Sequence, residues 1–179
     1  YMKLMNSRGV TTVKEMGFDD FYGFDSFLKE KEEKKELSLR TFFMSQPVGE
    51  GINIEHGKRM REKFQGDFVR FSGYNRMTDG TVASTKGDLL EPYEGTNMHC
   101  SIQVDYPMIE KEVQLADENG FRYSLHAQGD GAVHKVAGIF DKCQKKDGKL
   151  VNRHAVTDME FSNPADLKKM GEIGVTGEI

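Results

Sequence analysis

The chain has few cysteines, no long apolar segment and no basic leader, and each absence excludes a class of protein. Its two cysteines, Cys100 and Cys143, form neither a CxxC pair nor a zinc-ribbon spacing. This usage favours a reducing, cytoplasmic setting over that of a disulfide-rich secreted domain. Because no run of about 18 apolar residues is present, we expect no membrane partner and no membrane span. A secretory signal peptide is not expected either.

Charge of one sign is not concentrated anywhere in the sequence. The formal net charge is -4, and lysine and glutamate are intermixed. Because phosphate binding needs a concentrated cationic face, we expect no nucleic-acid partner. Residues 129–131, Gly-Asp-Gly, lack the Lys-Ser/Thr ending of a P-loop and the full GxGxxG pattern, so a tight turn between strand and helix explains them. Hydrophobic residues make up 37% and charged residues 30%, which is typical of a folded globular chain.

Strand-like and helix-like segments alternate along the first half of the chain. Residues 9–13 are β-branched and predict a buried strand. An amphipathic helix is expected from Asp19, because Phe21, Phe24 and Leu28 recur at helical spacing before a charged continuation. Further strands are expected at 37–44, ended by Pro47, and at 68–71, with a helix at 55–65 between them.

The stretch from Gly73 to Thr96 is polar and rich in turn residues. Compact domains usually reserve a loop of this length for function or leave it mobile. We therefore expect it to contribute to substrate binding.

The alternation continues through the second half of the chain. Strands are expected at 121–126, 150–156 and 173–179, and helices at 106–119, 132–145 and from Pro164 to about Gly171, with Asn163 as N-cap. Repeated strand and helix alternation predicts an α/β fold with a parallel sheet. A complete eight-stranded barrel typically needs about 250 residues. The prediction is therefore a partial TIM-type (β/α)8 barrel.

Two histidines stand near the expected ends of neighbouring strands. His126 closes the strand 121–126, and His154 lies near the end of the strand 150–156. Equivalent ends of adjacent parallel strands lie about 5 Å apart, which would bring both imidazoles within reach of one metal ion. A single strand-end histidine is more often a hydrogen-bonded polar residue than a ligand, but the matched placement of two reverses that preference. His126 and His154 are therefore the predicted metal ligands.

The remaining soft or borderline ligand types are expected to be structural. His99 and Cys100 are neighbours but lack partners at metal-site spacing. His56 and His134 fall within predicted helices, where solvated or capping roles are the rule, and Cys143 is expected to be packed.

Several segments together resemble one enzyme family. They are residues 9–13 (GVTTV), 79–84 (DGTVAS) with 89–93 (LLEPY), 125–133 (LHAQGDGAV) and 153–155 (RHA). In this order they resemble the amidohydrolase superfamily, and look closest to its amidohydrolase-3 branch, which includes formamide-deformylase-like and exoenzyme-regulator-like proteins. The resemblance implies a metal-dependent barrel that hydrolyses an amide or related C–N bond through a metal-activated water.

The resemblance also implies which residues act. His126 and His154 match the family's ligands after the fifth and sixth strands, and Asp79, Ser84 and Tyr93 would line the substrate pocket. The family's HxH pair and its strand-end aspartate have no counterpart, and its carboxylated lysine is replaced by Asn75. Because asparagine cannot be carboxylated, a binuclear centre is not expected.

These departures leave two readings. In the first, residues 1–179 are a single internal fragment of a metal-dependent hydrolase barrel; the parent holds a divalent metal such as zinc, and the fragment alone is inactive and binds metal weakly or not at all. Its ligand would be a small-molecule amide-type substrate, and exposed strand edges would favour self-association. In the second, the protein is a degenerate, non-catalytic barrel that serves as a binding or regulatory module, for which Asn75 is the chief motive.

Overall fold

The computed structural model describes residues 1–17, 23–46 and 51–178, which form two compact units, Tyr1–Asn75 and Arg76–Ile179. Each unit contains three parallel strands with helices between them. Asp19, Phe21 and Pro47, which entered the sequence predictions, lie outside the described residues.

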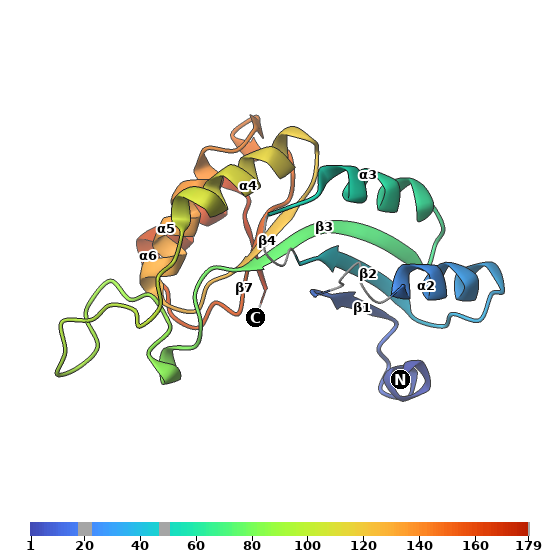
Figure 1. Ribbon diagram of the computed structural model, residues 1–179, viewed down its shortest axis with the longest axis horizontal. Helices are drawn as coiled ribbons and strands as arrows, with labels where there is room; N and C mark the ends of the chain where they lie inside the picture. The colour runs from blue at the N-terminus through green and yellow to red at the C-terminus, as the bar shows by residue number, and fades with distance from the viewer. Residues whose placement is uncertain (18–22, 47–50, 179) are drawn as a thin grey trace. The chain divides into compact units, whose positions relative to one another are not determined.

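The first unit is a three-stranded parallel arrangement with intervening helices (Figure 1). Its elements are α1 (Met2–Ser7), β1 (Thr12–Glu15), α2 (Phe24–Glu33), β2 (Arg40–Ser45), α3 (Ile54–Lys63) and β3 (Val69–Met77), whose last two residues belong to the second unit. In the register of the strands, Thr12 is opposite Arg40 and Thr41 is opposite Val69.

One hydrophobic cluster holds the first unit together. Leu28 of α2 and Met60 of α3 are packed with Phe43 of β2 and Val69 of β3, all of them buried. Phe43 meets Phe64 edge to face at a centroid distance of 5.2 Å. Because one cluster contains residues of both helices and both strands, α2 and α3 cover the same face of the strands.

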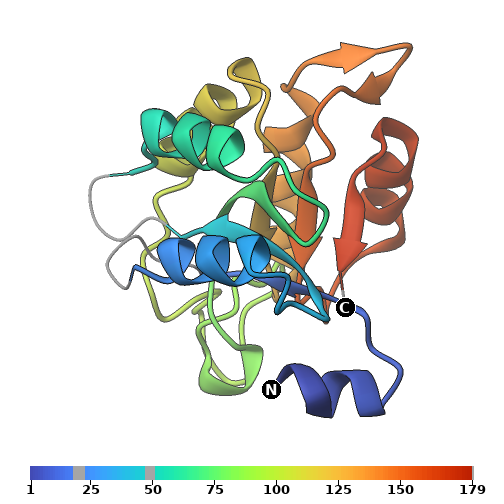
Figure 2. The same ribbon diagram turned by 90° about the vertical axis from the view of Figure 1, so that its right-hand side faces the viewer.

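The second unit repeats the pattern and adds a hairpin (Figure 2). Its elements are the 3₁₀ turn η2 (Val82–Ser84), α4 (Tyr106–Glu118), β4 (Tyr123–His126), α5 (Asp130–Asp141), β5 (Lys145–Lys146), β6 (Lys149–Leu150), β7 (Ala155–Thr157), α6 (Pro164–Ile173) and β8 (Thr176–Glu178). Strand β7 pairs in parallel with both β4 and β8. Strands β5 and β6 pair antiparallel with each other.

Local sequence signals set the ends of α6. The Asn163 side chain accepts a hydrogen bond from the Asp166 N–H at 2.9 Å, and Pro164 occupies the first helical turn. Gly174 ends the helix in the left-handed conformation at φ 83°. An amide N-cap, an N-terminal proline and a left-handed C-terminal glycine are the ordinary helix boundaries, and the sequence prediction of this helix is confirmed.

One predicted strand is wrong. Residues 150–156 do not form a single strand, because Leu150 belongs to the β5–β6 hairpin and the parallel strand begins only at Ala155. The residues between β5 and β6, Asp147 and Gly148, have φ values of 52° and 78°. Two consecutive positive φ values form the tight turn that the twist of a hairpin favours.

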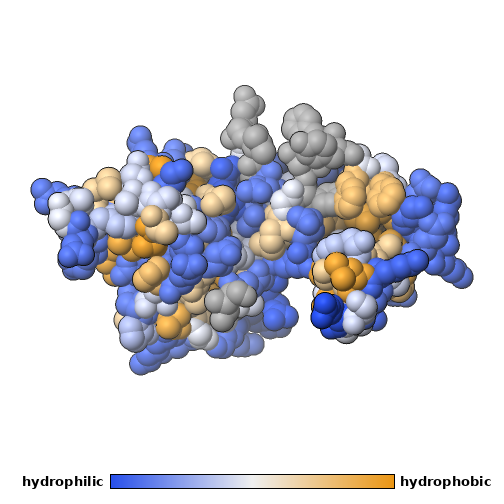
Figure 3. All heavy atoms as spheres, turned by 90° about the horizontal axis from the view of Figure 1, so that it is seen from below, coloured by the Kyte–Doolittle hydropathy of each residue, from blue (hydrophilic) through white to orange (hydrophobic). Residues whose placement is uncertain are grey.

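The predicted fold class is confirmed: the chain is an α/β partial barrel of parallel strands alternating with helices. None of the helices in the described part of the chain combines the length and hydropathy that crossing a bilayer requires. On the face drawn in Figure 3, hydrophilic residues predominate and hydrophobic side chains form scattered groups. This agrees with the low mean hydropathy of -0.62.

Candidate functional site

The carboxyl ends of the strands in the second unit bring His126, Thr157 and Asp158 to one edge. His126 is the last residue of β4 and is opposite Thr157, the last residue of β7, so Asp158 follows at the same edge. The N–H of Thr78, one residue beyond β3, donates to the His126 carbonyl at 3.0 Å. Working residues of parallel α/β folds gather at this end of the strands.

Asp79 is the most highly connected side chain at this edge. Its Oδ2 accepts from the N–H groups of Asp88 and Gly129, and its Oδ1 accepts from the N–H of Gln128, each at 2.9 Å. Burial alone would raise the pKa of Asp79, but the contact with His126 and the three backbone donors lower it below its usual value. The carboxylate side chain is fully buried, and it stays ionised because protein groups face both of its oxygens.

His126 faces that carboxylate with one ring nitrogen. Its Nδ1 lies 3.4 Å from Asp79 Oδ1, an ion-pair distance, and has no aligned hydrogen bond to the residues the structure describes. Contact with Asp79 raises the pKa of His126 despite burial, and the charge of Asp158 acts in the same direction. Because the nearest charged acceptor faces Nδ1, this environment favours the neutral tautomer with its proton on Nδ1 and its lone pair on Nε2.

The Gly-Asp-Gly turn at 129–131 is a close-packing site. The backbone of Asp88 crosses the start of α5, where its carbonyl accepts the N–H of Ala132 at 3.0 Å. A Cβ on Gly129 would lie 2.2 Å from that carbonyl oxygen. Glycine is required because the loop backbone occupies the space of a side chain, and the loop carbonyl takes an amide that would otherwise attract an anion.

Ser84 and Tyr93, the other predicted substrate contacts, make hydrogen bonds within the loop. Ser84 is exposed, and its hydroxyl lies 2.6 Å from that of Thr81. Tyr93 donates its hydroxyl to the Gly87 carbonyl at 2.8 Å. Together with the buried Asp79, these residues stabilise the loop, and their role in binding substrate stays a prediction.

His154 does not lie beside His126. It precedes β7, and since Ala155 is opposite Ser124, His154 is level with Tyr123 at the start of β4. The prediction that the two histidines share one strand end is therefore wrong. The cause is the misplaced strand: β7 begins at Ala155, so His154 stands at its amino end, about three residues of extended chain, or roughly 10 Å, from the carboxyl edge.

Both ring nitrogens of His154 are engaged. Nδ1 accepts the N–H of Tyr123 at 3.0 Å, and Nε2 lies 3.0 Å from Asp117 Oδ1. The ring is fully buried and stacks on Phe140 at a centroid distance of 5.1 Å. Burial lowers the pKa of His154 although Asp117 opposes this. Because Nδ1 accepts from a backbone N–H, the single proton of the neutral ring is on Nε2, which donates to Asp117.

His154 also belongs to a second cluster of potential metal ligands. Ligand atoms of Asp117, Cys143 and His154 lie within 4.8 Å of one another, and all three residues are buried. Their donor types suit zinc. However, Nε2 of His154 has no lone pair for a metal while Nδ1 accepts the Tyr123 N–H. In this arrangement the cluster satisfies the distances of a metal site, but the tautomer of His154 does not suit a ligand.

The remaining contacts of Asp117 explain the cluster without a metal. Its carboxylate also accepts the Gln144 N–H and the Asn152 side-chain amide, each at 2.7 Å. Three donors around one buried carboxylate form a satisfied hydrogen-bond network. The cluster therefore joins the end of α4 to the segment before β7.

The sequence reading missed Asp158 as a residue of the carboxyl edge. Asp158 is exposed, has φ 55°, and donates its N–H to the Glu178 carbonyl at 3.0 Å. Placing the strand end at Thr157 would have identified it. The signal was the Asp147-Gly148 turn, which separates the hairpin from β7.

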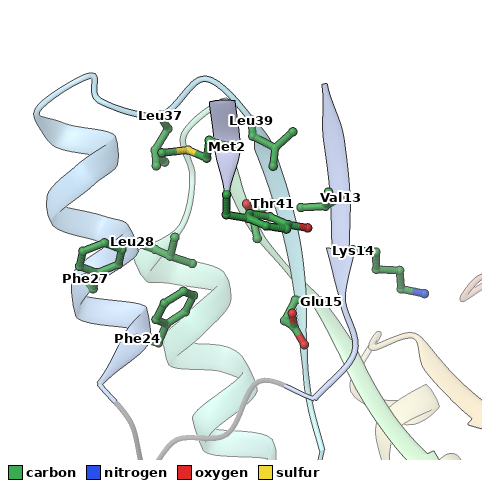
Figure 4. A pocket seen from close by; sticks show the side chains of 11 residues that line it. Met2, Val13, Lys14, Glu15, Phe24, Phe27, Leu28, Leu37, Leu39 and Thr41 are labelled. Atoms are coloured by element: carbon green, nitrogen blue, oxygen red, sulfur yellow. The ribbon is translucent and has the colours of Figure 1, made fainter. Parts of the chain in front are cut away.

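The first unit has an apolar pocket of about 470 Å³ between α2 and the strands β1 and β2 (Figure 4). Phe24, Phe27 and Leu28 line it from the helix, and Val13 and Leu39 are among the residues opposite. None of the predicted site residues lines this pocket.

The α/β fold recurs in known hydrolases. An uncharacterized metal-dependent hydrolase from Pyrococcus furiosus superimposes with a TM-score of 0.76 at 19% identity, covering 98% of this chain and 35% of the hydrolase. One from Pyrococcus horikoshii gives 0.75 at 17%, covering 98% of this chain and 34% of the hydrolase. At these identities the likeness establishes a shared fold.

Among characterised sequences, the chain is similar to Protein LONG AFTER FAR-RED 3 of Arabidopsis thaliana. The two are 20% identical over 190 residues, which cover 97% of this chain and 31% of that protein. No family model matches the chain. The chain thus spans about a third of the length of the proteins it resembles.

Proposed function

We propose that the chain is an internal part of a metal-dependent hydrolase barrel and contributes His126 as a ligand of a divalent metal, such as zinc. The observation that carries the proposal is the position of His126 at the carboxyl end of β4, with Asp79 opposite Nδ1. A metal-ligating histidine usually has a carboxylate or carbonyl beside its other ring nitrogen, and here the Asp79 carboxylate faces Nδ1 at 3.4 Å. The fold shared with metal-dependent hydrolases supports the same reading.

The residues at this edge suit part of a metal site. His126 would offer Nε2, and Asp158, one residue beyond the adjacent strand, would offer a carboxylate oxygen. A bound divalent ion supplies a water of lowered pKa and polarises the carbonyl under attack. Asp79 orients the histidine, and Thr78 fixes the end of β4 through its N–H.

The described residues supply an incomplete ligand set at this edge. The cluster of three ligand types that they contain is the separate one at Asp117, Cys143 and His154. Tight zinc binding needs three or four protein ligands, so other parts of a longer protein would complete the site. We therefore propose that residues 1–179 by themselves bind metal weakly and are inactive, and that the complete protein acts on a small-molecule amide or related C–N bond.

Asn75 favours a second function, that of a non-catalytic binding or regulatory module. Asn75 is buried, and its side-chain amide donates to the Met16 carbonyl at 3.0 Å. It therefore serves the packing of the first unit and cannot supply a bridging carbamate. A single-metal hydrolase needs no bridging carbamate, so Asn75 does not exclude the enzyme.

The test is the metal content and activity of the complete protein. We expect bound zinc, iron or manganese and hydrolysis of members of a panel of N-acyl and N-formyl compounds. His126→Ala should lose both. His134→Ala is the matched control, because His134 lies on α5 with a side chain that is 60% exposed and contacts only Asp166 among the ion pairs. A complete protein without metal and without activity would refute the enzyme proposal and favour the binding module.

Association between chains is a further part of the proposal. Strands β1 and β8 each have one paired neighbour among the described residues. Open strand edges recruit other chains, so we expect residues 1–179 to self-associate. Light scattering that finds only monomers over a wide concentration range would contradict this.

A further inference from the structure

The carboxylate of Asp79 is shared between a histidine and a loop. Oδ1 faces His126 Nδ1 and also accepts the Gln128 N–H, while Oδ2 accepts the N–H groups of Gly129 and Asp88. Asp88 belongs to the loop after β3, and Gln128 and Gly129 follow β4. One buried side chain therefore connects the end of β4 to the loop.

We propose that Asp79 is a positioning residue, whose carboxylate holds the ring of His126 with the proton on Nδ1 and Nε2 available as a ligand, and anchors the loop at Asp88 to the same ring. This inference rests on the proposed function of His126 and assigns Asp79 a role other than contact with substrate. Its side chain has 0% exposure and is enclosed by protein groups.

The contrast with His154 supports the assignment. Around His154 the neighbours are reversed: a backbone N–H faces Nδ1 and a carboxylate faces Nε2. The two histidines therefore have opposite tautomers, imposed by what stands beside each ring. Of these two rings, only that of His126 leaves Nε2 with a lone pair, and only that of His126 lies at the carboxyl edge of the strands.

The three backbone donors make Asp79 rigid as well as charged. A carboxylate that accepts several N–H groups cannot rotate away from the imidazole without losing those bonds. Replacement by asparagine would place an NH₂ group against an N–H donor or against His126. The isosteric Asp79→Asn change therefore removes the orienting acceptor with little change in volume.

The direct test is the tautomer of each histidine in the metal-free protein, measured from ¹⁵N shifts of the ring nitrogens at a pH where both rings are neutral. The five histidines are assigned by single substitutions. We expect the Nδ1–H form for His126 and the Nε2–H form for His154. An Nε2–H form of His126 would overturn the proposal, whatever the metal content.

The second test compares the zinc affinity of the complete protein carrying Asp79→Asn with that of Asp88→Asn. Asp88 is the matched control, because it is a buried aspartate of the same loop whose side chain binds Lys135 and Tyr106 and contacts no histidine. We expect a loss of about 10-fold to 100-fold in zinc affinity for Asp79→Asn. Asp88→Asn should keep its zinc affinity within about a factor of three.

The outcomes separate this inference from the proposed function. If His126→Ala retains its metal, the proposed function fails. If His126→Ala loses metal while Asp79→Asn binds zinc as the unsubstituted protein does, only the positioning role of Asp79 fails. If Asp79→Asn does not fold, the tautomer of His126 in the unsubstituted protein decides.

Discussion

Replacement of His154 by alanine separates a structural histidine from a metal ligand. The substitution removes the acceptor of the Tyr123 N–H, the Nε2 donor to Asp117 and the ring that stacks on Phe140. It leaves Asp117 with the donors of Gln144 and Asn152. Because every one of these contacts is buried, the change should lower the free energy of unfolding substantially.

The magnitude follows from the contacts. Depriving a buried N–H of its acceptor costs about 1–3 kcal/mol, and a hydrogen bond to a charged group contributes about 1.5–3 kcal/mol. The stacked ring adds about 0.5–1.5 kcal/mol. Allowing for relaxation around the cavity, we expect His154→Ala to lower the free energy of unfolding by about 3–5 kcal/mol.

The assay is urea unfolding followed by far-ultraviolet circular dichroism, since the chain has no tryptophan. The control is His134→Ala, which removes a largely exposed ring and should change stability by less than about 1 kcal/mol. A His154→Ala protein that is as stable as the control would refute the structural reading of the cluster.

Three further predictions test the packing around the site. Gly129→Ala should lower the melting temperature strongly, because its Cβ would lie 2.2 Å from a backbone oxygen, whereas Gly138→Ala, with nothing within 4 Å of the added Cβ, should stabilise α5 by about 0.5–1 kcal/mol in calorimetry. Glu112→Gln should cost about 3–5 kcal/mol in chemical denaturation, because it breaks a buried two-bond pair with Arg76. Burial holds the pKa of folded His154 below its ordinary value of 6.5, so the unfolded chain binds a proton that the folded chain does not. The contribution of neutral His154 to the free energy of unfolding is present above pH 6.5. It is lost as the pH falls towards the folded pKa, by about 1.4 kcal/mol per pH unit. The pH dependence of unfolding measured for His154→Phe should lack this part.

The elements of the fold were largely predictable because their signals are local. Asn163, Pro164 and Gly174 set the ends of α6 through their own backbone and side-chain chemistry. Residues 106–119 were expected as a helix, and the structure has α4 at Tyr106–Glu118, with Asp105 accepting the Met108 N–H at 3.0 Å. Alternation of such elements was sufficient to indicate an α/β fold.

The site was only partly predictable because it depends on where each strand begins and ends, and on which residues of neighbouring strands stand opposite each other. His126 was placed correctly at the end of its strand, since β4 is a short uninterrupted run. For His154, the apolar pair Leu150 and Val151 was taken as the start of the strand despite the hairpin turn at Asp147. A strand started five residues early moved the histidine to the wrong end. Asp117 lies far from His154 in sequence, and no local pattern links the two.

The most direct test of the account is the metal stoichiometry of the complete protein after removal of each histidine. Folded His126→Ala should contain no bound zinc, iron or manganese, and folded His154→Ala, although less stable, should keep the metal content of the unsubstituted protein. Loss of metal from His154→Ala with retention in His126→Ala would contradict the assignment of the metal to the carboxyl edge of β4.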